Sequence, residues 1–302
     1  MLIVSFIGFQ NDTIHVSSKN QQLDIVLRDG VELNEVNIVT RKLGTMKLRS
    51  SVMNEDMISS AELSRAACCN LGESFVTNPS VDVSYSDAAT GAKQIKLLGL
   101  SGTYVQMLTE NIPNYRGAAA PYGLGYVPGP WMQSIQVSKG TSSVKNGYEA
   151  ITGQINVEFK KPQLPEADWV SANLFASTTN RYEANADATL KLSKRWSTSL
   201  LAHYENETKA HDGNDDGFVD IPQVEQYNVW NRWAYMGDHY VFQAGIKALS
   251  ETRTSGQANH GGTMHSGDLY KVGIDTERYE FFTKNAYIFN KEKNTNLALI
   301  LS

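Results

Sequence analysis

Apolar and polar residues alternate over long stretches of the chain from about residue 167 onward. The clearest case is 182–192, where Tyr182, Ala184, Ala186, Ala188, Leu190 and Leu192 alternate with Glu183, Asn185, Asp187, Thr189 and Lys191. A period of two places the apolar set on one face of a β-strand and the polar set on the other. The pattern recurs and predicts strands at 169–177, 182–192, 196–206, 227–236, 240–250, 279–290 and 296–301.

The predicted connections between these strands differ in length. Those at 178–181, 194–195 and 237–239 are short, and those at 207–226 and 251–276 are long. Transmembrane β-barrels combine short periplasmic turns with long extracellular loops. A soluble β-sandwich also alternates, but strands of about ten residues with a consistently polar second face favour a barrel whose apolar set faces lipid.

Residues 135–162, IQVSKGTSSVKNGYEAITGQINVEFKKP, have a different organisation. The pattern predicts a short strand at 135–137, a Lys-Gly turn, a small-residue segment and an alternating strand at 154–159. No nucleophile–base pair or metal-ligand spacing occurs in this stretch, so it does not indicate catalysis. Upstream, a polar segment predicts a helix that begins at Asn54 or Ser59.

The stretch 135–162 resembles the end of the plug domain of TonB-dependent outer-membrane receptors. In that family I-x-V-x-K-G precedes a Gly-rich stretch and I-N-[IV]-x-x-K-K-P, which leads into the first barrel strand. Residues 91–113, GAKQIKLLGLSGTYVQMLTENIP, are similar to another family pattern. Two positions depart from it: Leu98 replaces the usual Arg before Gly99, and Glu110-Asn111 replace Asp-Gly.

The resemblance covers most of residues 33–302 and implies a mainly β fold. It divides the chain into the end of a carboxypeptidase-regulatory-like β-sandwich (1–32), a TonB box-like segment (33–39), an α+β plug (40–162) and the N-terminal portion of a transmembrane antiparallel β-barrel (163–302). The small sandwich is typical of Bacteroidetes-type receptors. Because a plugged transporter barrel has about 22 strands, the barrel is incomplete here. Neither end carries a signal peptide or a closing turn, so we expect the gene to extend beyond both.

The TonB box-like segment implies a partner that binds by β-augmentation. Alternating apolar residues in an extended segment offer backbone groups to the edge of a partner's sheet. The alternative is that the segment is the last strand of the small sandwich. The residues are Leu33, Asn34, Glu35, Val36, Asn37, Ile38 and Val39.

Composition narrows the function classes further. The 302 residues have a formal net charge of −5 and a mean hydropathy of −0.35, and they contain two cysteines. The chain lacks the basic footprint of a nucleic-acid-binding protein, any apolar run long enough for a membrane helix, and a disulfide framework. A barrel remains compatible, because its alternating strands have the average hydropathy of a soluble protein.

The loop 114–131 is rich in Gly, Pro and Tyr. In the family, the corresponding plug loops face the extracellular side and touch the substrate. Aromatic rings and a cation there would suit an anionic or aromatic ligand. The alternative is an irregular loop whose aromatic residues pack on the barrel wall. The candidate substrate-binding residues are Tyr115, Arg116, Tyr122, Tyr126 and Trp131.

Two further segments carry candidate metal ligands. Asp212, Asn214, Asp216 and Asp220 match most of the oxygen positions of a calcium loop, with Gln223 where an EF-hand has Glu. Ca²⁺ in an extracellular loop is one interpretation, and a solvated acidic turn is the other.

Softer ligands occur elsewhere. Cys68 and Cys69 could bind a soft metal, form a vicinal disulfide or be buried small residues. His260, Met264 and His265 could capture a metal such as copper or belong to an ordinary flexible loop.

The resemblance implies a receptor that is not an enzyme, requires no cofactor, and lies in the outer membrane with its plug and N-terminal region on the periplasmic side. Its partners would be the TonB energy-coupling protein, outer-membrane lipids and a scarce nutrient, typically a metal chelate such as a ferric siderophore. Import of copper, or of peptides or glycans together with a surface lipoprotein, is the alternative within this architecture. A soluble β-rich adhesin or binding module is the alternative outside it.

Overall fold

The computed structural model describes residues 2–4, 12–14, 25–26, 45–47, 54–66, 69–76, 78–87, 89–100, 102–141, 149–162, 170–258, 269–290 and 295–302. The chain consists of two units, Met1–Lys42 and Leu43–Ser302. In the first unit, β1 (Leu2–Val4) pairs antiparallel with β2 (Asp12–Ile14). The TonB box-like segment 33–39 lies outside the described residues. Its assignment and that of the small sandwich therefore stay predictions.

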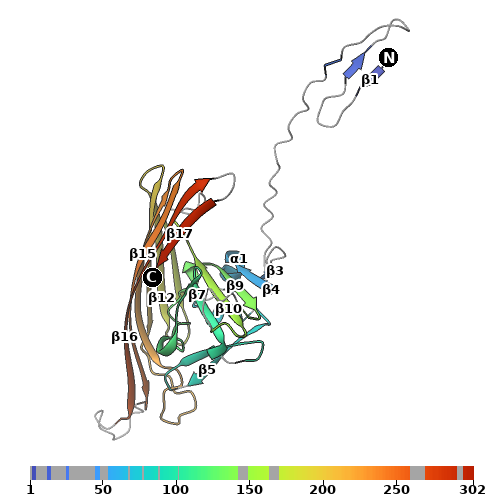
Figure 1. Ribbon diagram of the computed structural model, residues 1–302. Helices are drawn as coiled ribbons and strands as arrows, with labels where there is room; N and C mark the ends of the chain where they lie inside the picture. Colours follow the sequence, from blue (N-terminus) through green and yellow to red (C-terminus); the bar gives the residue numbers. More distant parts are fainter. Residues whose placement is uncertain are drawn as a thin grey trace. The chain divides into compact units, whose positions relative to one another are not determined.

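In the second unit, residues 135–162 contribute two central strands of a six-stranded sheet (Figure 1). The strands β9 and β10 pair antiparallel, with Ile135 opposite Val157, and β10 runs parallel to β7. The two strands predicted here are therefore confirmed, and β9 begins earlier than expected. In spatial order the sheet contains β3 (Thr45–Lys47), β4 (Asn54–Ser59), β9 (Met132–Lys139), β10 (Gly153–Phe159), β7 (Val105–Thr109) and β8 (Ile112–Pro113).

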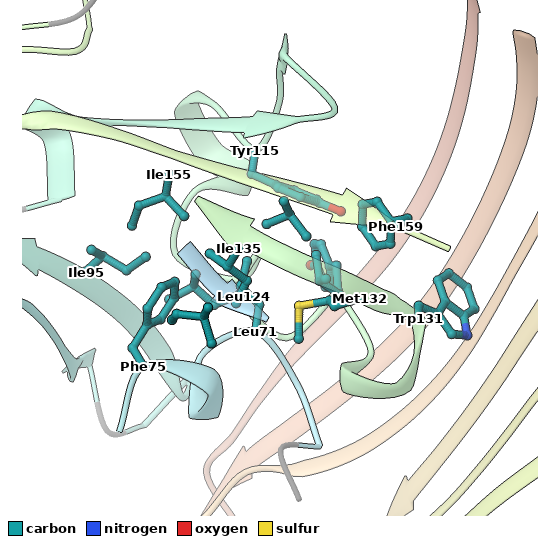
Figure 2. Packing of buried hydrophobic residues seen from close by; sticks show 14 of the residues in the cluster. Leu71, Phe75, Ile95, Tyr115, Leu124, Trp131, Met132, Ile135, Ile155 and Phe159 are labelled. Atoms are coloured by element: carbon teal, nitrogen blue, oxygen red, sulfur yellow. The ribbon is translucent and has the colours of Figure 1, made fainter. Parts of the chain in front are cut away.

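Alternate residues of the central strands build a hydrophobic core. Ile135, Val137, Ile155, Val157 and Phe159 are each at most 1% exposed. A period of two places them on one face of the sheet, where burial of aliphatic and aromatic side chains contributes about 1.5–3 kcal/mol each. Figure 2 shows this core, in which residues from other segments join the strands: Leu71, Phe75, Leu124 and Trp131.

Shorter elements surround this sheet. The helix α1 (Ser60–Arg65) follows Ser59, whereas the alternative start at Asn54 is wrong. Residues 54–59 instead pair with β9, because their alternate residues Asp56 and Ile58 are buried against the sheet. The remaining elements are η1 (Glu73–Phe75), β5 (Val81–Asp87), β6 (Ala92–Leu97), η2 (Gly102–Tyr104), η3 (Gly117–Ala119) and η4 (Gly129–Trp131). We call residues 45–162 the plug region.

A seven-stranded antiparallel sheet follows, in which each strand pairs with the next along the chain. We call it the strand wall. All seven predicted strands are present in it. They are β11 (Val170–Ala176), β12 (Tyr182–Lys191), β13 (Trp196–Glu207), β14 (Gln223–Met236), β15 (Tyr240–Gly256), β16 (Lys271–Asn290) and β17 (Thr295–Leu301).

The connections of the strand wall require one correction. Strict antiparallel succession puts the connection 177–181 at the same end as the long connections 208–222 and 257–270. It is therefore not one of the turns at the opposite end, although it is short. The long connections are also shorter than predicted, because β14, β15 and β16 all extend toward this end.

The two faces of the strand wall have the reverse of the polarity found in a soluble protein. On β12, Tyr182 and Leu190 are 51% and 49% exposed, whereas Glu183 and Asn185 are 3% and 5% exposed. The polar face is covered by the plug region, and the apolar face is open. Large exposed apolar surfaces mark contact with another apolar phase or partner. Among the described residues, no helix is both long and apolar enough to span a membrane.

Gly153 allows the close pairing of β9 and β10, which gives a first testable prediction. Its φ is +152°, and an added Cβ would lie 2.1 Å from the carbonyl oxygen of Ser138. We expect Gly153→Ala to lower the free energy of unfolding by about 2–4 kcal/mol. The urea midpoint of the purified protein, followed by tryptophan fluorescence, measures the change.

Gly140→Ala is the matched control. Gly140 also has a positive φ, of +92°, but an added Cβ would meet nothing within 4 Å. Only the backbone strain of about 1–2 kcal/mol applies there. Equal urea midpoints for the two variants would contradict the role assigned to the close approach at Gly153.

Candidate functional site

A cavity of about 370 Å³ opens between the plug region and the strand wall. Ile221 and Pro222 of the connection 208–222, together with Thr179, line it, so it lies at the long-connection end of the wall. On the plug side the hairpin β5–β6 and the loop 114–131 reach the same cavity. The lining side chains used below are Tyr85, Lys93 and Tyr122 from the plug region and Arg181, Glu205 and Arg253 from the wall.

Arg181 joins the plug region to the wall at this cavity. Its guanidinium lies 3.0 Å from Glu73 of the plug region and 2.6 and 3.1 Å from Glu183 and Glu205 of the wall. Glu73 also accepts hydrogen bonds from the backbone N–H of Cys69 and from a neighbouring amide side chain. The charge of Arg181 is therefore fully compensated by carboxylates.

Arg253 is compensated in the same way. Its guanidinium lies 3.0 Å from Glu251, which also accepts a hydrogen bond of 2.8 Å from Gln226. The same guanidinium stands 5.5 Å from the ring centroid of Tyr122 and donates to the carbonyl oxygen of Thr90. Arg253 thus contacts the loop 114–131 and the hairpin connection together.

Lys93 differs from both arginines. Its backbone N–H donates to the carbonyl oxygen of Pro121 over 2.9 Å, which attaches β6 to the loop 114–131. Its ammonium stands 5.4 Å from the ring centroid of Tyr85, and it forms no ion pair with any carboxylate of the described residues. Burial lowers the pKa of Lys93, and the charge of Glu73 opposes that shift.

A second contact between plug region and wall is a buried ion pair. The turn between β7 and β8 places Glu110 and Asn111 at positive φ, 50° and 66°, as a two-residue hairpin turn requires. The carboxylate of Glu110 lies 2.6 Å from the guanidinium of Arg232 on β14, and both side chains are 2% exposed. Arg232 also donates to the carbonyl oxygen of Lys160 over 2.7 Å, and Lys284 donates to that of Glu110 over 2.7 Å.

A third contact holds the loop 114–131. Lys247 of β15 donates to the hydroxyl of Tyr115 over 3.1 Å and to the carbonyl oxygen of Tyr126 over 3.3 Å. Asn228 donates to the same carbonyl oxygen over 3.0 Å. Asn114 donates to Glu280 of β16 over 2.8 Å. The inner face of the wall thus supplies donors to backbone groups that the irregular loop leaves free.

The five candidate substrate-binding residues do not form one surface. Tyr115, Tyr126 and Trp131 are at most 4% exposed, the placement that the alternative interpretation of wall packing expects. Tyr122 lines the cavity. The guanidinium of Arg116 lies 2.8 Å from Glu149. Ligand binding by these residues stays a prediction, and among them Tyr122 is the one that lines the cavity.

The proposed calcium ligands lie in the connection 208–222. Asp212 and Asp220 accept hydrogen bonds from the backbone N–H groups of Gly217 and Gly213, at 2.8 and 2.7 Å. Asp216 accepts one from Asn214 over 2.9 Å. Throughout the described ranges, no three His, Cys, Asp or Glu side chains are grouped so that they could hold a metal ion. Calcium binding stays a prediction.

The softer candidate ligands are only partly described. Cys69 is a buried free thiol, and burial, with Glu183 and Glu73 nearby, raises its pKa. Such a thiol stays protonated at neutral pH, and soft metals bind the thiolate. Cys68, His260, Met264 and His265 lie outside the described residues, so their roles stay predictions.

Sequence patterns did not single out Lys93, Arg181 or Arg232. The alternation on β14 does place Arg232 on the polar face, which is a usable signal. Lys93 belongs to a hairpin strand, whereas the family resemblance implies ligand contacts in the loop 114–131. The partner of each cation depends on how the plug region packs against the wall, which local patterns do not reveal.

The buried ion pair gives a second testable prediction. Arg232→Met would leave the buried carboxylate of Glu110 with Lys284, at 3.6 Å, as its one cation among the described residues. We expect the free energy of unfolding to fall by about 3 kcal/mol. Adding Glu110→Gln should restore most of that loss, because the uncompensated charge is removed. Urea midpoints of the single and double variants measure both effects.

Arg195→Met is the control for the loss of a wall arginine. Arg195 pairs with Asp238 over 2.9 Å, but the two side chains are 56% and 68% exposed. An exposed pair contributes at most about 1 kcal/mol. If Arg232→Met costs no more than Arg195→Met, the buried pair does not hold the plug region in place.

Comparison with known proteins matches part of this chain to a family. Residues 47–154 match the TonB-dependent Receptor Plug Domain. Over 185 residues the chain is 24% identical to the vitamin B12 transporter BtuB of Vibrio vulnificus (strain CMCP6), covering 61% of this chain and 30% of BtuB. The matched plug residues lie within the predicted range 40–162.

Solved structures share the arrangement of plug region and strand wall. P. aeruginosa FpvA bound to a heterologous pyoverdine–Fe complex superposes with a TM-score of 0.62 at 14% identity, over 82% of this chain and 33% of FpvA. The ferric-catecholate import receptor Fiu of E. coli K12 gives a TM-score of 0.60 at 17% identity, over 80% of this chain and 37% of Fiu. At these identities the likeness concerns the fold.

The chain spans about a third of the length of the proteins it matches. Those proteins are receptors and transporters, not enzymes. Residues 47–154 thus match a TonB-dependent receptor plug domain, and the strand wall whose polar face this plug covers has the fold of the similar receptors.

Proposed function

We propose that this receptor actively takes up a scarce nutrient across the outer membrane, and that the nutrient is a metal chelate such as a ferric siderophore. The observation that carries the proposal is the cavity of about 370 Å³, which both the plug region and the strand wall line. Its volume falls in the range of about 300–1,000 Å³ typical of small-molecule sites. A ligand bound there would touch both parts at once.

The placement of the cavity supports uptake from outside the cell. In membrane barrels the long loops are extracellular, and the cavity lies at the long-connection end of the wall. The open apolar face of the wall, with Tyr182 and Leu190, would contact lipid. A soluble adhesin would have to cover that apolar surface in another way, which makes this alternative less suitable.

The choice of a metal chelate is supported by the relatives. FpvA is described in complex with pyoverdine and iron, and Fiu is described as a ferric-catecholate import receptor. Both share the plug-and-wall fold of this chain. Peptide or glycan import with a surface lipoprotein, and copper import, remain alternatives that the uptake experiment below separates.

Transport would require the plug region to move, because its contacts close the inner face of the wall. The Glu110–Arg232 pair and the donors on β15 hold it against the strands. The TonB protein would bind the segment 33–39 by β-augmentation and transmit force from the inner membrane. No step of this cycle requires bond chemistry by a side chain.

Uptake by a deletion strain tests the proposal. We expect loss of the gene to abolish growth on a ferric siderophore as the sole iron source, while growth on copper or cobalamin at limiting supply is unchanged. Radiolabelled iron accumulation measures the effect. Growth defects on peptides or glycans alone would instead favour the alternative substrates.

Val36→Pro tests the partner segment separately. Proline removes a backbone N–H that β-augmentation would use, so uptake should fall at least about tenfold while ligand binding persists. Val36→Ala keeps that N–H and serves as the control. Full uptake by the proline variant would contradict a role of 33–39 in coupling.

A further inference from the structure

We propose that Lys93 receives a negatively charged oxygen group of the ligand, a catecholate or a carboxylate, in the cavity between the plug region and the strand wall. This inference rests on the proposed uptake function and specifies the chemistry of its ligand. It makes Lys93 a specificity-determining residue at a position outside the loop 114–131.

The backbone around Lys93 fixes its position. Lys93 lies on β6, opposite Tyr85 on β5. Its backbone N–H is bonded to the carbonyl oxygen of Pro121, so the hairpin and the loop 114–131 are attached at this residue. Lys93 therefore lines the cavity from a supported strand rather than from a free loop.

Among the cations that line the cavity, Lys93 is the one whose charge lacks a carboxylate within the described residues. Arg181 binds Glu73, Glu183 and Glu205. Arg253 binds Glu251. The Lys93 ammonium instead stands 5.4 Å from the ring centroid of Tyr85.

A partly buried ammonium whose contact within the described part of the chain is an aromatic ring has lost hydrogen bonds that water would supply. The cation–π contact with the ring contributes about 0.5–2 kcal/mol in place of those hydrogen bonds. A charged oxygen of a ligand would form a charge-assisted hydrogen bond, which is stronger than a neutral one. Arg116 is a less suitable partner for a charged ligand oxygen, because its guanidinium is already paired with Glu149 at 2.8 Å.

The carboxylates around the cavity are themselves engaged. Glu73 and Glu205 bind Arg181, Glu251 binds Arg253, and Glu207 accepts a hydrogen bond from the hydroxyl of Thr179. Their summed charge still opposes an approaching anion at long range. Attraction of an anionic ligand must therefore come from direct contact with Lys93. A substitution of Lys93 then tests this contact separately from the electrostatic field of the other charges around the cavity.

The walls beside Lys93 suit a flat ligand body. The rings of Tyr85 and Tyr122 line the same cavity. Aromatic rings stack on planar groups while an ammonium fixes the charged oxygen. An aromatic ring that carries its charged oxygens at one edge, as a catecholate does, matches this combination best.

Binding measurements on the purified full-length receptor test the inference. The probes are iron(III) tris(catecholate) and iron(III) citrate, which are anionic, and iron(III) tris(acetohydroxamate), which is neutral. Quenching of tryptophan fluorescence reports binding. We expect Lys93→Met to weaken binding of the anionic probes at least about tenfold, the loss of one charge-assisted hydrogen bond, and to leave the neutral probe unchanged.

Two further variants separate charge from structure. Lys93→Arg keeps the charge and should bind the anionic probes within about threefold of the wild type. Lys96→Met removes a cation from the other face of the same strand, outside the cavity lining, and should change nothing. Circular dichroism and heat-dependent electrophoretic mobility confirm that each variant is folded.

Several outcomes would overturn the inference. These are an unchanged affinity of Lys93→Met for both anionic probes, an equal loss for the neutral probe, or no binding of either anion by the wild type. A larger loss with citrate than with catecholate would assign the site to carboxylates. Binding is measured without TonB, so failure here leaves the uptake experiments of the proposed function independent.

Discussion

The ion pair between Glu110 and Arg232 is the contact on which the placement of the plug region depends. Both side chains are 2% exposed, so neither charge has water as a substitute partner. The same guanidinium holds the carbonyl oxygen of Lys160 at the end of β10, and thus ties two neighbouring strands of the plug sheet to β14. More generally, the polar inner face of the wall requires polar partners from the plug region. An apolar core packed there would leave charged groups buried without partners, at a large cost in free energy.

Much of the strand wall could be predicted from the period of two. The predicted starts at Trp196 and Tyr240 agree with the structure, since apolar residues there face one side and polar residues the other. The prediction fails where β15 continues to Gly256 and β16 begins at Lys271. In the β15 extension, polar residues occupy both faces from Glu251 to Gly256, so no alternation marks the strand there. In the β16 extension, only Val272 and Ile274 are apolar, and Thr276 and Arg278 interrupt their face before Tyr279.

The candidate site could be predicted only in part. The loop 114–131 does reach the cavity, through Tyr122, but composition could not distinguish this ring from Tyr115 and Tyr126. Lys247 binds the hydroxyl of Tyr115 and the backbone carbonyl oxygen of Tyr126. Every tyrosine carries both groups, so the residue type does not reveal which tyrosine is buried. Arg232 and Glu110 are 122 residues apart, and each looks like an ordinary charged residue of a turn or strand. Their pairing follows from tertiary packing, which a single sequence does not display.

The strand order of the plug sheet has a mechanical consequence. Within the described residues, three pairs, Thr45 with Ile58 through Lys47 with Asp56, join the edge strand β3 to β4. The strands β9 and β10 each pair on both sides, over longer stretches. Tension applied at residue 45 would therefore separate β3 from β4 first. A small extension would then need little force, and the hydrophobic core around β9 and β10 would unfold last.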